Sequence, residues 1–284
     1  MIGDFYGVVT VYSPPFSYLE NISTYAPFLK ELLVVDNSPD NVDRTVELNQ
    51  KFPNIRYFKV DNIGVGAALN LGLKLGLDQG CSWLLTMDQD SKFGSGDFLK
   101  FMETRTLNPD IAIVSPNNEN LKKENFIAIG KNNKLSAPEY VLTSGNLVDI
   151  KVLASLGGYR SDFFIDWIDI EICYRIKKMG HEILVDWDVV FEHHLGVIMH
   201  YDIFSKKIPI TIHSAQRYYY MVRNAGYVLI GYLNFRDMRR LLVQLTKVFI
   251  FKRNRLDFLS SVLIGLYHFL INKKGKHILK KNTP

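Results

Sequence analysis

The sequence contains few cysteines and no long run of apolar residues. Cys81 and Cys173 are its two cysteines, they lie far apart, and they form no CxxC pair. A disulfide framework or a zinc site of the CxxC kind is therefore not expected, and both thiols are predicted to be buried in a cytosolic protein. The longest apolar stretch, residues 258–271, contains two serines and a histidine. It is shorter than the ~18 residues that a membrane-spanning helix needs.

A secretory signal, internal repeats and low-complexity tracts are also lacking. Residues 1–11 contain no basic segment followed by a long apolar run, so we expect no signal peptide. The chain is 47% hydrophobic and 22% charged, which is typical of a folded globular protein. Its 284 residues are enough to bury a large core.

Basic residues are concentrated in the last part of the chain. Residues 236–284 carry 12 Lys and Arg against two Asp, whereas the net charge of the whole chain is +5, so the remainder is acidic. From about Tyr218 the pattern predicts helices, and residues 241–270 place apolar side chains around Lys247, Lys252, Arg253 and Arg255. Such a segment is predicted to lie on an anionic membrane surface, or else to pack on the body or on another subunit. Nucleic-acid binding is not expected, because no recognition motif accompanies the basic residues.

Strands and helices alternate along the first part of the chain. Apolar runs predict strands at residues 7–12, 32–35, 55–60 and 83–87, and helical spacing predicts a helix at 66–77. This alternation predicts a doubly wound α/β sheet, whose ligands bind beyond the carboxyl ends of the strands. Polar residues stand at these ends: they are Thr10, Tyr12, Asp36, Asn37, Asp61, Asn62, Asp88 and Asp90.

The later part of the body is less regular. Residues 117–134 are rich in Asn and Lys and predict an exposed loop or hairpin. Residues 166–179 predict an amphipathic helix closed by Gly180, and residues 182–190 predict a further strand.

Asp88-Gln89-Asp90 is the sharpest local signal. Two carboxylates two residues apart after a strand can converge on a divalent cation such as Mg²⁺ or Mn²⁺, which would neutralise a diphosphate leaving group. An acidic turn that ends the strand explains the same residues. His193, which follows another apolar strand, is either a further ligand or a structural histidine.

Two other acidic motifs have both a functional and a structural interpretation. Asp36-Asn37 can accept hydrogen bonds from a pyrimidine, or can form a turn. Asp166 and Asp169 can lie on one helical face among apolar neighbours that would raise a carboxyl pKa, as a general base requires, or can cap a helix.

Asn62-Ile63-Gly64-Val65-Gly66 partly matches a dinucleotide-binding fingerprint. It follows a predicted strand and opens a predicted helix, but the third glycine is missing because position 69 is Leu. A nucleotide-dependent oxidoreductase is therefore an alternative from a different class. A silent sugar-nucleotide-binding module is another.

In their order and spacing, these pieces resemble glycosyltransferase family 2, the inverting enzymes of the GT-A fold. The resemblance covers roughly residues 6–224, and the branch it most resembles is the rhamnosyltransferases, whose donor is dTDP-L-rhamnose. The motifs that carry it are Val9-Thr10-Val11-Tyr12, Val35-Asp36-Asn37-Ser38, Asn62-x-Gly64, Thr86-Met87-Asp88-Gln89-Asp90-Ser91, Gly157-Gly158-Tyr159, Asp166-Trp167-Ile168-Asp169, His193-x-x-Gly196 and Arg217-x-Tyr219-Tyr220-x-x-Arg223-Asn224.

The resemblance implies a Rossmann-like, mostly parallel sheet flanked by helices, with a basic helical appendage. The catalytic domain would be residues 1–224, with a nucleotide half to about 92 and an acceptor half from 93, and the appendage residues 225–284. Asp169 would be the catalytic base, with Asp166 sharing the acceptor role, and Asp90 and His193 would hold Mg²⁺ or Mn²⁺. The donor would be bound by Thr10, Tyr12, Asp36, Asn37, Asn62, Gly64, Asp88 and Arg223.

Two departures from the family pattern and one open choice remain. Ile168 stands where many relatives have Glu, and Leu69 stands where they often have Arg. A UDP-sugar donor is the alternative to dTDP-rhamnose, because Asp36 accepts from uracil and thymine alike. The acceptor would be a glycan or a polyprenyl-linked sugar of bacterial cell-surface polysaccharide synthesis. That implies a peripheral position on the inner face of the plasma membrane.

Overall fold

A computed structural model of the chain describes residues 4–40, 42–104, 110–118, 127–129, 135–193, 198–203, 206–251 and 255–279. The chain forms two compact units. The first comprises Met1–Ser161 and Ile168–His194, and the second comprises Asp162–Trp167 and Leu195–Pro284. Six residues of the middle of the chain therefore belong with its C-terminal part.

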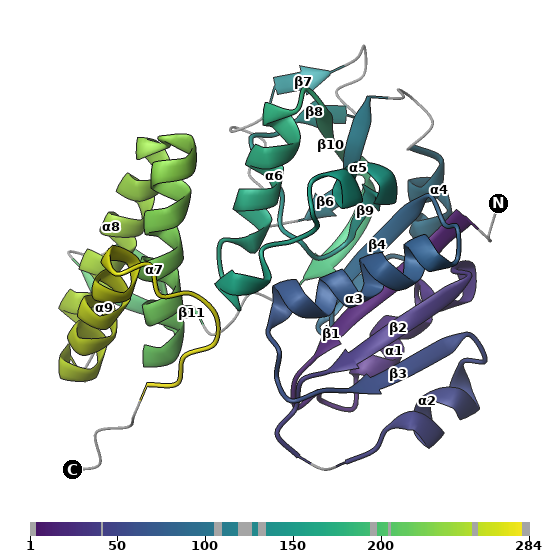
Figure 1. Cartoon of the computed structure of the whole chain (residues 1–284), viewed down its shortest axis with the longest axis horizontal. Helices are drawn as coiled ribbons and strands as arrows, with labels where there is room; N and C mark the ends of the chain where they lie inside the picture. Colours follow the sequence, from purple (N-terminus) through teal and green to yellow (C-terminus); the bar gives the residue numbers. More distant parts are fainter. Residues whose placement is uncertain are drawn as a thin grey trace. The chain divides into compact units, whose positions relative to one another are not determined.

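The first unit is built on a mostly parallel sheet of ten strands, in the order β3-β2-β1-β4-β9-β6-β10-β8-β7, with β5 paired to β10 (Figure 1). Strands β1 to β4 run parallel, and β9 is antiparallel to both β4 and β6. This confirms the predicted α/β class. The strands are β1 (Phe5–Val11), β2 (Glu31–Asp36), β3 (Ile55–Lys59), β4 (Trp83–Asp88), β5 (Ser91–Phe93), β6 (Ile111–Asn118), β7 (Ile127–Ile129), β8 (Leu135–Ala137), β9 (Asn146–Asp149) and β10 (Glu182–His193).

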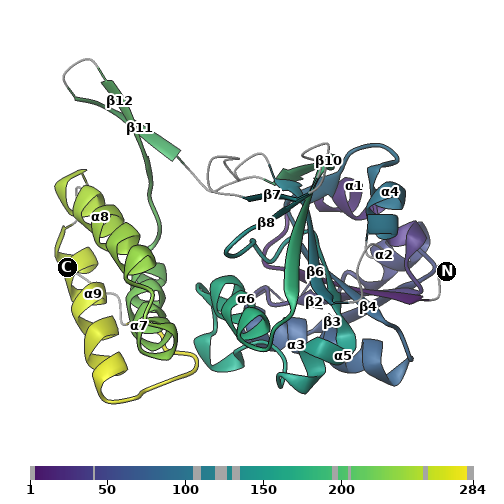
Figure 2. The same ribbon diagram turned by 90° about the horizontal axis from the view of Figure 1, so that it is seen from above.

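Helices cover both faces of this sheet. Figure 2 shows α3, α5 and α6 along one face and α1 and α4 along the other. Both faces of β1 are apolar: Val9 packs in the core with residues of α1 and α4, and Val8 lies against Gly72 of α3. Such double burial explains the continuous apolar runs of the sequence. The helices are α1 (Tyr18–Ser23), α2 (Thr45–Lys51), α3 (Val65–Asp78), α4 (Asp97–Thr104), α5 (Ile150–Ser155) and α6 (Ile168–Lys178).

The second unit contains three long helices and a hairpin. They are α7 (Ala215–Tyr232), α8 (Phe235–Phe251), α9 (Arg255–Leu270) and the antiparallel strands β11 (Ile198–Ile203) and β12 (Lys206–Thr211). Ser214 caps α7, since its side chain accepts from the backbone N–H of Arg217. Gly265 lets α9 approach α7 closely, because a Cβ there would lie 2.7 Å from the carbonyl oxygen of Tyr219. Among the described helices, none has the length and hydropathy to cross a membrane.

The structure differs from the predicted division of the chain at 224/225. That boundary falls inside α7, which belongs wholly to the second unit. The hairpin β11–β12 was not predicted either. A loop or hairpin was predicted at residues 117–134. Strand β7 lies within this range and pairs antiparallel with β8, which follows it. Residues 119–126 and 130–134 lie outside the described part. His194, Gly196, Lys252 and Arg253 also lie outside it.

The helix predicted from Asp166 begins two residues later, at Ile168. Phe164, Asp166 and Trp167 have φ values of +69°, +64° and +67°, which are incompatible with a right-handed helix. Each non-glycine residue in this left-handed conformation costs about 1–2 kcal/mol. The surrounding structure must therefore hold this segment in place.

Candidate active site

Two carboxylates and one imidazole meet at the carboxyl end of β4. Ligand atoms of Asp88, Asp90 and His193 all lie within 4.8 Å of one another, and the three side chains are half-buried. Asp90 Oδ1 lies 3.5 Å from His193 Nδ1. The three residues therefore fit a divalent cation, and the carboxylates suit Mg²⁺ and Mn²⁺ alike.

Strand pairing brings these distant residues together. Asp88 is the last residue of β4 and pairs with Thr10 of the neighbouring β1. The chain then turns through Asp90 into β5, which runs antiparallel to β10 and sets Ser91 opposite His193. The histidine thus reaches the two aspartates from about one hundred residues farther along the chain because β10 ends beside β5.

Two serines and a glutamine support this group. Ser91 Oγ lies 2.7 Å from His193 Nδ1, and Ser144 Oγ donates to Ser91 Oγ at 2.8 Å. Ser144 also accepts from the backbone N–H of Asp88 at 3.0 Å. Gln89 accepts from the backbone N–H of Tyr12 at 2.7 Å. Such neighbours orient metal ligands. No sequence pattern indicated Ser144, because its loop approaches β4 only in the fold.

The remaining predicted donor residues of the first unit follow β1, β2 and β3. Tyr12 is 51% exposed, whereas Asn37 is buried. The Asn37 side chain accepts from the backbone N–H of Ile63 at 2.9 Å and so links the ends of β2 and β3. Asn62 and Gly64 both have positive φ, +30° and +84°, in the turn that leads into α3. Together with Thr10, these residues form one polar edge of the sheet.

Gly66 does not serve as an open phosphate cradle. A Cβ at this position would lie 2.6 Å from the carbonyl oxygen of Arg160. The glycine is therefore needed for close packing of protein backbone against α3. This removes the main support for the dinucleotide-binding interpretation of the Gly64-x-Gly66 motif.

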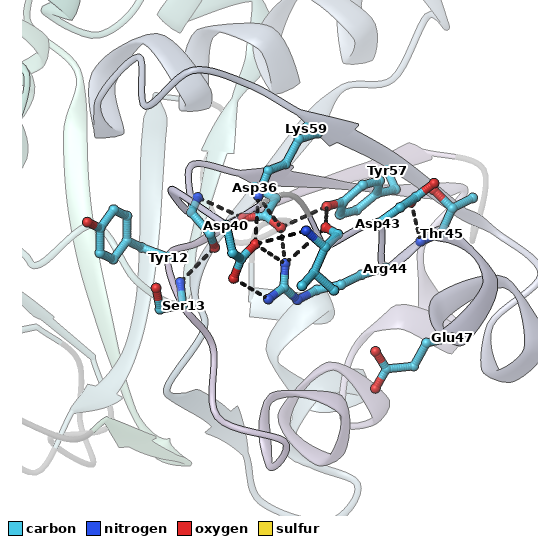
Figure 3. A network of polar contacts seen from close by, with 12 residues as sticks. Tyr12, Ser13, Asp36, Asp40, Asp43, Arg44, Thr45, Glu47, Tyr57 and Lys59 are labelled. Atoms are coloured by element: carbon cyan, nitrogen blue, oxygen red, sulfur yellow. Dashed lines mark hydrogen bonds and ion pairs between the residues drawn. The ribbon is translucent and has the colours of Figure 1, made fainter.

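Asp36, at the end of β2, lies at the centre of a polar network (Figure 3). The residue is fully buried. Its Oδ1 accepts from the backbone N–H of Ser38 at 2.8 Å, and its Oδ2 accepts from Tyr57 at 2.7 Å and from Arg44 at 2.6 Å. Lys59 Nζ lies 3.4 Å from Oδ2. The predicted contact with a pyrimidine therefore requires one of these donors to move away, a condition that the sequence did not reveal.

These contacts govern the ionisation of Asp36. Burial acts to raise its pKa, but hydrogen bonds from Ser38 and Tyr57 and the charge of Arg44 outweigh burial and hold the pKa below its usual range. Burial and the hydrogen bond to Asp36 raise the pKa of Tyr57 to about 12. At neutral pH Asp36 is therefore an anion and Tyr57 a neutral donor.

Asp169 and Asp166 fall in different units. Asp169 lies in the first turn of α6, in the first unit, where its Oδ1 accepts from the backbone N–H of Ile170 at 2.9 Å. A carboxylate is favoured at this end of a helix. Asp166 lies in the second unit, and its Oδ1 lies 3.0 Å from Arg217 Nε of α7. Burial raises the pKa of Asp166, and the charge of Arg217 opposes this rise.

Arg223 is not placed to bind a phosphate, which corrects the expectation for this residue. It is fully buried. Its Nε donates to Asn224 Oδ1, its Nη1 to Tyr219 Oη and the Gly275 carbonyl, and its Nη2 to the carbonyls of Asp162 and Phe163. A guanidinium has five N–H donors, and these contacts use all of them.

We expect Asp36→Asn to lower the free energy of unfolding by roughly 3 kcal/mol at neutral pH, because it breaks a buried ion pair and leaves Arg44 less compensated. Since the folded-state pKa of Asp36 is lowered, the advantage of the wild type is full above pH ~4 and is lost as the pH falls through that pKa. Urea unfolding of both proteins over a pH series measures this. Glu20→Gln, which removes an exposed carboxyl on α1, is the control and should change little. A difference that stays constant at the lowest pH would contradict the assignment.

No protein-family profile matches the chain. The dTDP-rhamnosyl transferase RfbF of Shigella flexneri is 25% identical over 292 residues, and the alignment covers 93% of this chain and 95% of that protein. This relative therefore has nearly the same extent as the present chain.

Several solved structures have the same fold. A mannosyltransferase from Pyrobaculum calidifontis in complex with GDP-Man and Mn²⁺ has a TM-score of 0.56 at 13% identity, covering 95% of this chain and 88% of that one. Residues 1–349 of S. aureus TarS in complex with UDP-GlcNAc also have a TM-score of 0.56, at 18% identity, with 94% and 80% covered. GalNAc-T7 with UDP, GalNAc and Mn²⁺ has a TM-score of 0.56 at 11% identity over 90% of this chain.

The present chain spans only 57% of GalNAc-T7, so the match there is to part of a longer protein. The low identities show the fold and no more. The chain has the GT-A fold of these glycosyltransferases, and its sequence resembles a bacterial dTDP-rhamnosyl transferase along nearly its whole length.

Proposed function

We propose that this protein is a metal-dependent glycosyltransferase, which moves a sugar from a nucleoside diphosphate donor onto an acceptor hydroxyl. The observation that carries the proposal is the convergence of Asp88, Asp90 and His193 at the edge of the sheet where β1 to β3 also end. Asp88, Asp90 and His193 would hold a divalent cation, which would supply positive charge to neutralise a diphosphate leaving group. Thr10 and the turn after β3 line the same edge, where a nucleotide binds in folds of this type.

The donor we propose is dTDP-L-rhamnose. Its support is the similarity to RfbF, named as a dTDP-rhamnosyl transferase. A UDP-sugar is the alternative, since TarS and GalNAc-T7, which share the fold, are described with UDP-GlcNAc and UDP. Asp36 accepts a hydrogen bond from the N–H of either pyrimidine once Arg44 or Tyr57 has released it.

The acceptor step needs a base, and we propose Asp169. Its carboxylate takes the proton of the acceptor hydroxyl, the acceptor oxygen forms the new bond to the anomeric carbon, and the bond to the diphosphate breaks on the opposite face. The configuration at the anomeric carbon inverts and the nucleoside diphosphate leaves with the electron pair. Asp166, paired with Arg217, orients the acceptor. We propose a glycan or a polyprenyl-linked sugar as acceptor.

We propose that the second unit rests on an anionic membrane surface through α8 and α9. Apart from Arg255 at its start, the exposed side chains of α9 are all apolar and recur at helical spacing: Leu256, Leu259, Leu263, Leu266, Tyr267 and Leu270. On α8, Phe235, Leu242 and Phe249 recur every seven residues and are exposed as well. Exposed basic residues stand on the same helix, and they are Arg236, Arg239, Arg240 and Lys247.

An apolar face with adjacent basic residues is complementary to an anionic lipid surface, which offers both an apolar interior and negative charge. We therefore favour lipid over a partner protein as the surface that this face contacts. Apolar side chains enter the boundary of the acyl chains, and each Lys or Arg near the surface adds about 1 kcal/mol. Such a position would bring a lipid-linked acceptor to the enzyme on the inner face of the plasma membrane.

The first experiment is calorimetric titration of the wild type and Asp90→Ala with dTDP and with UDP, each with and without Mn²⁺ or Mg²⁺. We expect dTDP affinity to need the metal and to fall roughly 100-fold in Asp90→Ala, because one carboxylate ligand is lost. Glu192→Gln is the matched control, as it removes an exposed carboxyl that pairs with Lys92 one residue before His193. A preference for UDP would keep the transferase proposal and overturn the rhamnose donor. Absence of binding by either nucleotide would overturn the proposed function.

The second experiment separates the two candidate acids. Asp169→Asn should lower kcat of sugar transfer by about 100-fold or more while the affinity for dTDP is unchanged, because a general base contributes about that much. Asp166→Asn should raise KM for the acceptor more than it lowers kcat. Initial-rate kinetics with the acceptor varied distinguish the two. Equal loss of dTDP binding and of transfer in Asp169→Asn would contradict a role as base.

The third experiment tests the membrane surface by co-sedimentation with phosphatidylcholine vesicles, prepared with and without phosphatidylglycerol. We expect the wild type to bind the anionic vesicles and Leu263→Glu to bind them at least about tenfold more weakly, because a charge replaces an inserted side chain. Leu77→Glu, which changes an exposed leucine of α3, is the control and should bind like the wild type. Equal binding by both variants would overturn this surface. A dimer that Leu263→Glu disrupts would point to a second copy as the occupant.

A further inference from the structure

Two neighbouring residues of α7 hold the backbone of residues 162–167, which we name the acceptor segment because it contains Asp166. Asn224 is fully buried. Its Nδ2 donates toward the carbonyls of Phe163, Ile165 and Asp166 at 3.0, 2.8 and 3.0 Å. Only the NH₂ end of an amide can face three carbonyl oxygens, so the orientation of this side chain is fixed by its partners.

Arg223 holds the beginning of the same segment. Its Nη2 donates to the carbonyls of Asp162 and Phe163 at 3.1 and 2.9 Å, and its Nε donates to Asn224 Oδ1 at 3.0 Å. The ring of Tyr220 stacks on Phe164 with 4.9 Å between centroids. Arg223 thus positions Asn224, and both residues position the backbone of the acceptor segment.

The residues after α9 complete this arrangement. Arg223 Nη1 donates to the Gly275 carbonyl at 2.7 Å, and the backbone N–H of Gly275 donates to the Asp162 carbonyl, also at 2.7 Å. The acceptor segment is therefore held from α7 and from the end of the chain at once.

The conformation that these bonds maintain is an unusual one. Three of the six residues of the acceptor segment are non-glycine residues with positive φ, and Asp166 is among them. These conformations interrupt helical hydrogen bonding along the segment, so the carbonyls of residues 162, 163, 165 and 166 need other donors. Arg223 and Asn224 supply those donors, and Arg217, six residues earlier on α7, holds the Asp166 carboxylate.

We propose that Arg223 and Asn224 are positioning residues for the acceptor half of the reaction, which act by keeping the acceptor segment, and with it Asp166, in its left-handed conformation. This inference rests on the proposed glycosyltransferase function. It assigns the Arg-Asn pair of α7 to the acceptor and not to the donor diphosphate. Loss of the pair should therefore impair transfer and leave the nucleotide site of the first unit unaffected.

Asn224→Asp tests the proposal with almost no change in size. The carboxylate still accepts from Arg223, but it places an oxygen against three carbonyl oxygens. We expect kcat/KM for the acceptor to fall roughly 10- to 100-fold, mainly through a higher KM as in Asp166→Asn, because small misplacements of a group that orients the substrate have effects of this size. The calorimetric affinity for dTDP and Mn²⁺ should be unchanged. Hydrogen–deuterium exchange of the amides of residues 163–167 should become faster.

Tyr220→Phe is the matched control. It lies in the same helix and loses its hydrogen bonds to His277, but it keeps the ring that stacks on Phe164 and every bond from Arg223 and Asn224 to the acceptor segment. Its transfer rate and the exchange of residues 163–167 should match those of the wild type. If Asn224→Asp does not fold, Arg223→Lys replaces it, because a lysine cannot span the carbonyls of Asp162, Phe163 and Gly275 together.

The outcomes separate this inference from the proposed function. A wild type without transferase activity would overturn the function, and hydrogen exchange would still report whether Asn224 holds the acceptor segment. Faster exchange with an unchanged kcat/KM for the acceptor would overturn the positioning role. So would an equal loss of dTDP affinity and transfer, or the same loss in Tyr220→Phe, because each would indicate general damage to the fold.

Discussion

The register between β1 and β4 is the constraint on which the candidate site depends. It sets Thr10 beside Asp88, so that β4, which leads into the acidic pair, and β1, which carries Thr10, end at the same edge of the sheet. Packing on both faces favours this register, because a slip of one residue would move each side chain to the opposite face and away from the helix against which it packs. The short β5 then places Ser91 against β10 and brings in His193. A cation site from such distant residues needs all three strands in place.

The first unit contains two groups of acidic side chains, and they differ in how their negative charge is neutralised. The buried Asp36 carboxylate is held by Arg44 and Tyr57 with Lys59 nearby, so that it remains ionised despite burial. The acids of the proposed cation site are half-buried and lie close to one another, an arrangement that a divalent cation would stabilise. The two groups therefore differ in kind: one is already neutralised by protein cations, and the other is suited to a bound one.

The second unit holds a segment from the middle of the chain in an unusual backbone conformation. Its helices present apolar outer side chains, while its interior uses Arg223 and Asn224 to satisfy backbone carbonyls of a left-handed segment from the middle of the chain. Strain in residues 162–167 is thus balanced by hydrogen bonds that depend on α7 and on residues after α9. The sequence predicted only a basic helical appendage after residue 224. In the fold, α7 extends across that boundary and holds Asp166.

The sequence by itself determined the α/β class, the strands β1 to β4 and the acidic residues at their ends, because apolar runs and the polar residues that end them are local patterns. Only the tertiary structure decided the rest. In the fold, Arg223 donates to backbone carbonyls, and Asp36 is bound by Arg44 and Tyr57. Helix α6 begins at Ile168 and not at Asp166. These outcomes depend on partners 8 to 61 residues away. The hydrogen bonds of a buried polar group are decided only when the folded chain brings such distant residues together.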